Sequence, residues 1–171
     1  MSKTTLKRIA KQIAGPGINE EGQYLNFILD EEIYAINILC VREIIEYQDV
    51  TDVPMLPDYV SGVVNLRGRV LPVVDLLKRF GRKSSPIGKR TCIVVIQVIS
   101  DELDPIDIGI VVDSVSEVAE IPIRNIEKAP TMGSSIKSEF IAGLGKMEKS
   151  FVIILTLDSI ITHEIMQELM S

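Results

Sequence analysis

Residue types that perform catalysis are sparse in this sequence. The single histidine, His163, lies in a segment with helical spacing, and no serine or cysteine nucleophile can be paired with it from the sequence. We therefore interpret His163 as a solvated helical residue. Gly143-Leu144-Gly145 begins a glycine-rich pattern, but it lies in a predicted hairpin without a third glycine or a following helix. A phosphate-binding loop is accordingly disfavoured.

The side chains that could bind a metal ion also follow no known pattern. Four acidic residues lie close together without the glycine and terminal glutamate of a calcium loop: Asp101, Glu102, Asp104 and Asp107. No spacing of cysteine and histidine suits zinc. We expect a solvated acidic loop, no metal, no cofactor and no enzyme activity. A carboxylate pair for glycoside chemistry stays compatible with the sequence, although no pattern supports one.

One arginine is conspicuous by its position. In NLRGRVLPVVDLL, residues 65 to 77, Arg67 and Gly68 separate two apolar runs and form the tip of a predicted hairpin. Gly68 can adopt the positive φ that a type I turn with a glycine bulge requires. An arginine on a turn offers a planar fork to a carboxylate or a carbonyl. On physical grounds alone, a solvated turn residue is favoured over a binding residue.

Alternation of apolar residues predicts a mainly β fold. The expected strands are 24–29, 33–36, 42–47, 63–66, 69–74, 92–99, 106–112, 117–121, 140–144 and 151–157. Pro72 cannot donate to a ladder, so its strand is expected at a sheet edge or bulged at that point. Asp75 and Asp158 are expected to cap a short helix and the C-terminal helix, respectively.

The two halves of the chain show the same order of features. YAINILCVREII (34–45) matches IGIVVDSVSEVA (108–119), and further on Gly62 aligns with Gly143. The repeat predicts two similar β-barrels of about five strands each, packed together because each is too small to be robust alone. We place a basic N-terminal helix or tail at 1–22, the first barrel at 23–88, and the second barrel with the C-terminal helix at 89–171.

Composition excludes several classes of protein. The chain has 171 residues, of which 46% are hydrophobic and 25% charged, as in a folded globular protein. The net charge of −6 disfavours nucleic acid and anionic membranes as partners, and no apolar run reaches the roughly 18 residues that cross a bilayer. Cys40 and Cys92 lie in apolar strings, where buried thiols in a reducing cytoplasm are favoured over a disulfide.

Three blocks of sequence, in this order, resemble the CheW-type chemotaxis coupling proteins. They are YAINILCVREIIEYQDVTDVPMLPDYVSGVVNLRGRVLPVVDL (34–76), GIVVDSVSEV (109–118) and FIAGLG (140–145). The resemblance implies one CheW-like domain over 23–171, built from two SH3-like barrels. It further implies a cytoplasmic adaptor, recruited to membrane receptor arrays. Its partners would be the cytoplasmic hairpin tip of methyl-accepting chemoreceptors and the regulatory domain of the chemotaxis histidine kinase.

The same resemblance assigns roles to individual residues. The expected receptor site combines positions that match the family's receptor-binding residues with neighbouring apolar residues that could anchor a helix in a groove. Its members are Ile38, Val41, Glu43, Ile44, Gly62 and Arg67. Arg67 would fix the helix by polar contact. Val41 is equally compatible with core packing, and Gly62 with a role in shaping the backbone. Gly109 and Gly143 match kinase-binding positions on the second barrel, where they could also act by preserving the fold.

Other functions stay open at this point. A chemosensory pathway with a non-flagellar output would use the same motifs. A small-molecule-binding barrel, or a phosphatase acting on a response regulator, would need an acidic pair in a cleft, and none can be placed. The negative net charge, and the lack of a group of aromatic or basic residues that could bind RNA, disfavour an RNA-binding barrel. Because no phosphotransfer or ATP-binding segment is present, a stand-alone protein is expected.

Overall fold

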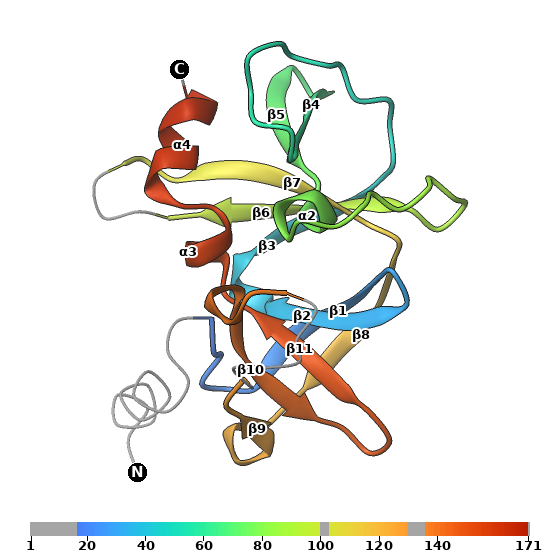
Figure 1. Ribbon diagram of the computed structural model, residues 1–171, viewed down its shortest axis with the longest axis vertical. Coiled ribbons are helices and arrows are strands. Elements are labelled where there is room, and N and C mark those ends of the chain that lie inside the picture. Colours follow the sequence, from blue (N-terminus) through green and yellow to red (C-terminus); the bar gives the residue numbers. More distant parts are fainter. Residues whose placement is uncertain (1–16, 100–102, 130–135, 171) are drawn as a thin grey trace. The chain divides into compact units, whose positions relative to one another are not determined.

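The computed structural model describes residues 17–99, 103–129 and 136–170, so most of the predicted N-terminal helix or tail lies outside the described residues. The described chain is mainly β with short helices, as predicted (Figure 1). It divides into two compact units. Unit 1 consists of Met1–Leu39 and Val115–Ile160, and unit 2 consists of Cys40–Ser114 and Ile161–Ser171.

Unit 1 contains a six-stranded sheet in the order β8-β1-β2-β11-β10-β9. Its strands are β1 (Gln23–Leu29), β2 (Glu32–Asn37), β8 (Ser114–Glu120), β9 (Ile126–Glu127), β10 (Ile141–Lys146) and β11 (Phe151–Leu155). Its short helices are η1 (Ile38–Cys40, at the boundary of the unit), η2 (Ile123–Asn125), η3 (Ser138–Phe140) and α3 (Leu157–Ile160). The chain runs from β8 through η2 into β9, which pairs with β10 and closes the sheet around a core that includes Tyr24 and Ile154.

Unit 2 contains a five-stranded sheet in the order β3-β6-β7-β5-β4. Its strands are β3 (Val41–Glu46), β4 (Val60–Leu66), β5 (Arg69–Val74), β6 (Cys92–Val98) and β7 (Ile106–Val112), and its helices are α2 (Leu76–Arg79) and α4 (His163–Met170). The segment after β3 closes this sheet, because Thr51 and Val63 of β4 exchange two backbone hydrogen bonds of 2.8 and 2.9 Å. Leu71, Ile93 and Val95 form the centre of its apolar core.

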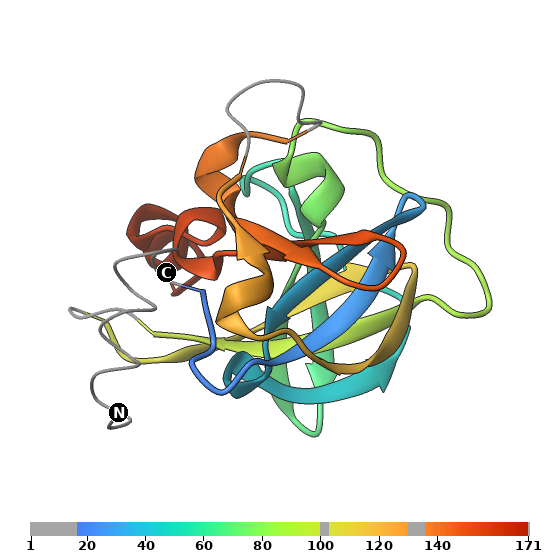
Figure 2. The same ribbon diagram turned by 90° about the horizontal axis from the view of Figure 1, so that it is seen from below.

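The two barrels are not continuous halves of the chain, so the boundary expected between residues 88 and 89 matches neither unit. The β1–β2 hairpin lies between β8 and β11 from the second half, and the β6–β7 hairpin lies between β3 and β5 from the first half (Figures 1 and 2). Parallel pairs join them, with Tyr34 opposite Ile153 and Gly109 opposite Val73. Periodicity predicts which segments are strands and which of their faces are buried. It does not predict which barrel each hairpin joins, because either hairpin would bury the same faces in either barrel.

Helix boundaries agree with the sequence at α2 and differ at the C-terminus. Asp75 caps α2, where its Oδ1 accepts a hydrogen bond of 3.1 Å from the N–H of Lys78. Asp158 does not cap a helix, because α3 already begins at Leu157. The expected single C-terminal helix is two helices, α3 and α4, and α4 belongs to unit 2.

The sequence predicts an edge strand or a bulge at Pro72. Pro72 lies in β5, which has β7 on one side and β4 on the other and is not an edge strand. The irregularity in this pair lies on β4 instead, between Val60 and Gly62. Pairing of β5 with β7 starts only at Val73, one residue after the proline. The missing N–H of Pro72 therefore removes no bond from that ladder.

Candidate functional site

The tip of the β4–β5 hairpin holds Arg67 in an unfavourable backbone conformation. Leu66 pairs with Arg69, so the loop contains only Arg67 and Gly68. Their φ angles are +51° and +82°, which is the pattern of a type I′ turn and not of the expected type I turn with a bulge. The side chain of Asn65 accepts a 3.0 Å hydrogen bond from the N–H of Gly68. Asparagine or glycine would fit the position of Arg67 with less strain.

A β-bulge determines on which face of the sheet each side chain of β3 lies. Val41 and Glu43 pair with consecutive residues of β6, so Arg42 is the extra residue. The shift places Val41 on the same face as Ile44, and Glu43 on the opposite face together with Val95. Ile44 is 46% exposed, and Val41 is half-buried. The edge strand of unit 2 therefore presents an apolar pair on one face and a carboxylate on the other.

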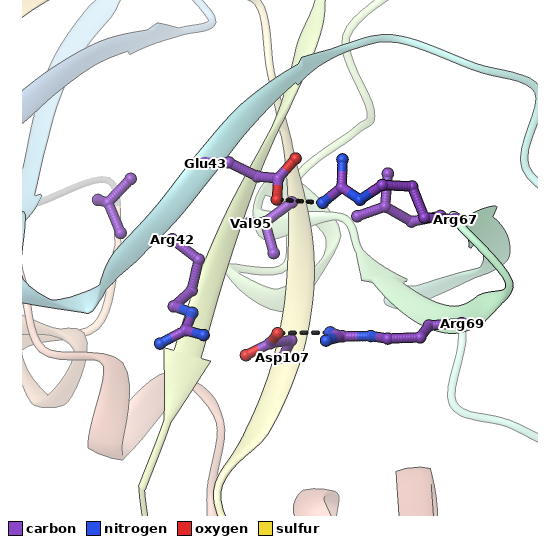
Figure 3. Close-up of a pocket in the computed structure, with 8 residues that line it drawn as sticks. Arg42, Glu43, Arg67, Arg69, Val95 and Asp107 are labelled. Carbon is purple, nitrogen blue, oxygen red and sulfur yellow. Dashed lines mark hydrogen bonds and ion pairs between the residues drawn. The ribbon is translucent and has the colours of Figure 1, made fainter.

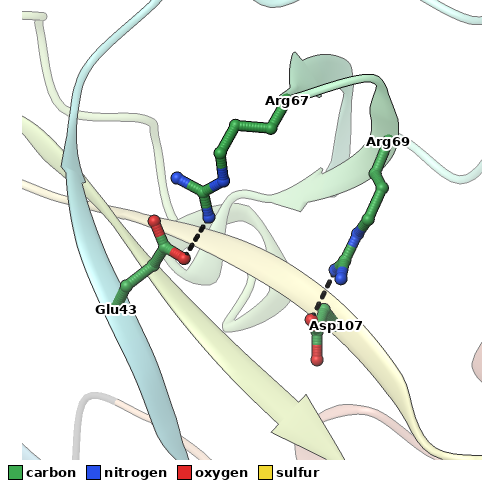
Figure 4. A network of polar contacts seen from close by, with 4 residues as sticks. All are labelled: Glu43, Arg67, Arg69 and Asp107. Atoms are coloured by element: carbon green, nitrogen blue, oxygen red, sulfur yellow. Dashed lines mark hydrogen bonds and ion pairs between the residues drawn. The ribbon is translucent and has the colours of Figure 1, made fainter.

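Two ion pairs join the hairpin tip to β3 and to β7 (Figure 4). Arg67 Nη2 donates to Glu43 Oε2 on β3 at 2.5 Å, and Arg69 Nη2 donates to Asp107 Oδ2 on β7 at 2.6 Å. The side chain of Asp107 is only 14% exposed, whereas that of Arg67 is 69% exposed. The hydrogen bond to Glu43, reinforced by its charge, raises the pKa of Arg67 above the usual arginine value. Asp107 was counted among the solvated acidic residues, but it lies in β7, within the predicted strand 106–112, and is paired with Arg69.

A surface pocket of about 350 Å³ lies between these residues (Figure 3). It is lined by Val41, Arg42, Glu43, Leu66, Arg67, Arg69, Val95 and Asp107. Leu66 supplies apolar surface above the buried Val95, and three arginines and two carboxylates supply charge. The pocket can therefore accept a polar side chain beside a small apolar contact.

The structure brings together half of the expected receptor site. Val41, Glu43 and Arg67 all line the pocket. Ile44 lies on the same strand, β3, on the face opposite Glu43. Ile38 lies in η1 and belongs to unit 1.

Gly62, the last residue of that set, has a backbone role. It is buried in β4 with φ +144°. A Cβ at this position would overlap the carbonyl oxygen of Thr51 and lie 2.8 Å from its carbon. Glycine is required here because the segment that closes the barrel of unit 2 passes directly over it.

Gly109 and Gly143 were expected on one barrel and lie in different units. Gly109 is in β7 of unit 2, and Gly143 is in β10 of unit 1. Both are buried, and an added Cβ would lie 2.7 Å from a methyl of Ile93 or 2.6 Å from a methyl of Ile126, respectively. Exchange of the hairpins between the barrels separates the two glycines.

Within residues 17–99, 103–129 and 136–170, no three His, Cys, Asp or Glu side chains are grouped so that they could hold a metal ion. No helix in those ranges has the length and apolar character needed to span a bilayer. His163 begins α4 and is half-buried. Cys40 and Cys92 are not joined in a disulfide.

Five of the eight pocket residues were not among the expected site residues: the apolar Leu66 and Val95, and the charged Arg42, Arg69 and Asp107. Arg69 had a usable signal, since it flanks the same two-residue turn as Arg67. Asp107 lies in the predicted strand 106–112, so its place on a strand was available from the sequence, although its partner was not. Arg42 had no signal, because a bulge that changes the alternation of β3 cannot be seen in the sequence.

Comparison with known proteins gives a consistent set of relatives. The CheW-like domain family matches residues 23–164. The chemotaxis protein CheW of Klebsiella aerogenes is 32% identical over 153 residues, covering 90% of this chain and 88% of that protein. The chemotaxis protein CheW of Rhizobium meliloti is 34% identical over 142 residues, covering 83% and 88%. The crystal structure of the scaffolding protein TtCheW from Thermoanaerobacter tengcongensis matches with a TM-score of 0.74 at 30% identity, covering 85% of this chain and 95% of that one.

Proposed function

Because this chain belongs to the CheW-like domain family of chemotaxis proteins, we propose that it is a non-enzymatic adaptor. It would couple methyl-accepting chemoreceptors to the regulatory domain of the chemotaxis histidine kinase, in cytoplasmic arrays recruited to the membrane receptors. The similar proteins are named chemotaxis proteins, and the similar crystal structure is that of a scaffolding protein. The same contacts would serve a chemosensory pathway with a non-flagellar output.

On this proposal the receptor hairpin binds unit 2 along β3 and the tip of the β4–β5 hairpin. Val41 and Ile44 share one face of an edge strand and would contact the apolar side of a helix. Arg67 would make the polar contact that fixes the orientation of that helix. The single observation that carries the proposal is the state of Arg67, an exposed arginine held at positive φ on a turn where a smaller residue would fit better.

The ion pair between Arg67 and Glu43 is compatible with this role. Both side chains retain solvent access, at 69% and 34%, so water already competes for the pair. A carboxylate or carbonyl of the receptor could therefore share the guanidinium without leaving a buried charge unpaired. Glu43 would hold the fork of Arg67 in place before binding, which reduces the side-chain entropy lost on binding.

For the kinase, we propose an indirect role for Gly109 and Gly143. Both are buried and closely surrounded, so they would preserve the backbone of β7 and β10 and not touch the partner themselves. Substitutions there would weaken kinase binding through the fold.

Calorimetric titration tests the receptor site. The protein is titrated with a receptor-tip fragment and, separately, with the kinase regulatory domain. Arg67→Ala should weaken receptor binding about tenfold or more, because a hydrogen bond to a charged group is lost, and should leave kinase binding unchanged. Arg124→Ala is the matched control, since Arg124 is an exposed arginine on η2 of unit 1. Absence of binding to both partners by the folded protein would refute the adaptor proposal.

A further inference from the structure

Arg42 is the one arginine of the pocket whose position is set by the bulge in β3. It is the extra residue between Val41 and Glu43, and bulges commonly redirect a side chain. Arg42 is exposed and lines the pocket together with Arg67 and Arg69 (Figure 3). A regular strand would have placed residue 42 on the face opposite its two neighbours.

The charges of the pocket do not balance. Glu43 is paired with Arg67, and Asp107 is paired with Arg69. The guanidinium of Arg42 makes neither an ion pair nor a hydrogen bond with any residue in the described ranges 17–99, 103–129 and 136–170. The pocket therefore carries one excess positive charge, in a chain whose net charge is −6.

We propose that Arg42 receives a carboxylate side chain, aspartate or glutamate, from the receptor hairpin. The inference rests on the proposed function and names the chemistry that the site selects. The planar fork of arginine can bind a carboxylate through two parallel hydrogen bonds. Leu66 would contact the methylene groups of the incoming side chain.

The two existing ion pairs make the pocket selective. Glu43 and Asp107 already have partners on the hairpin tip, so a lysine or arginine from the receptor would meet the unpaired Arg42 and be repelled. An aspartate or glutamate would complete a set of three arginine–carboxylate pairs. Arg42 would thus decide which receptor side chain enters, whereas Arg67 would orient the helix.

The test uses full-length Arg42→Glu and the matched control Arg124→Glu, each titrated with the receptor-tip fragment and with the kinase regulatory domain. We expect Arg42→Glu to weaken receptor binding about tenfold or more, while Arg124→Glu and kinase binding stay unchanged. Exposed Asp and Glu residues of the fragment are then changed to Lys one at a time. One of these changes should weaken binding to the original protein and restore binding to Arg42→Glu.

The possible failures are distinguishable. If Arg67→Ala weakens receptor binding but Arg42→Glu does not, the receptor site stands and the role of Arg42 is refuted. If Arg42→Glu weakens binding but no fragment variant restores it, Arg42 acts without a carboxylate partner on the receptor, and the inference is again overturned. If the original protein does not bind the fragment at all, the proposed function itself fails.

Discussion

Gly62→Ala should destabilise the protein severely, although glycine to alanine is a small change in volume. The new Cβ would overlap the carbonyl oxygen of Thr51 and lie 2.9 Å from a methyl of Val50, so the closing segment of unit 2 must move. Overpacking of this kind costs about 1–3 kcal/mol. Alanine at φ +144° adds about 1–3 kcal/mol of backbone strain. The sum, about 2–6 kcal/mol, is a large share of the roughly 5–15 kcal/mol that stabilises a typical domain.

Urea denaturation followed by far-UV circular dichroism measures this loss. With a slope of about 2 kcal/mol per molar, the midpoint should fall by about 1–3 M. Gly68→Ala is the matched control, because Gly68 also has a positive φ, +82°, but nothing lies within 4 Å of its added Cβ. The control should lose only about 1 kcal/mol. Equal losses for the two variants would refute the argument that Gly62 is required by the close approach of Thr51.

Three further results are expected. Arg67→Asn should leave the urea midpoint unchanged or slightly raised, because asparagine tolerates positive φ, whereas receptor binding should fall. A large loss of stability would instead show that the ion pair between Arg67 and Glu43 stabilises the fold. Gly109→Ala and Gly143→Ala should each lower stability by about 1–3 kcal/mol, and kinase binding should fall only with the folded fraction; loss of binding at full stability would indicate direct contact. Burial raises the pKa of the Tyr24 hydroxyl, and a hydrogen bond from the N–H of Asn19 partly offsets this rise. The unfolded chain therefore releases the Tyr24 proton at a lower pH than the folded chain, so the free energy of unfolding should fall as pH rises above about 10. Urea midpoints between pH 9 and 12 should show this fall, and Tyr24→Phe should reduce it.

Local chemistry made the hairpin tip and the first helix cap predictable. Arg67-Gly68 between two apolar runs indicated a turn, and Asp75 before Leu76 indicated a cap. Strand positions were likewise predictable, from the alternation of apolar and polar residues. Each of these signals depends only on residues that are neighbours in the chain.

The pairing of strands could not be predicted, because the duplication makes the two hairpins interchangeable. Tyr34 of β2 and Ile108 of β7 occupy equivalent, fully buried positions in the two units, so no local signal decides which barrel each strand completes. The same ambiguity placed Gly109 and Gly143 on one barrel when they lie in two.

Three of the eight pocket residues were predictable for a different reason. Val41, Glu43 and Arg67 were reached through the family pattern, whereas Arg42 depends on a bulge and Asp107 on a partner 38 positions away in sequence. Neither a bulge nor an ion pair between distant residues leaves a periodic trace. The pocket therefore became visible only when β3, β7 and the hairpin tip were placed together.

Coupling requires that one molecule of the protein bind receptor and kinase at the same time. The most direct test is to saturate the protein with the receptor-tip fragment and then titrate in the kinase regulatory domain by calorimetry, with the complex sized by analytical ultracentrifugation. We expect a second binding event, with an affinity similar to that of the kinase domain for the receptor-free protein, and a particle containing all three components. Displacement of the receptor fragment by the kinase domain would contradict it, because the two partners would then compete for one surface.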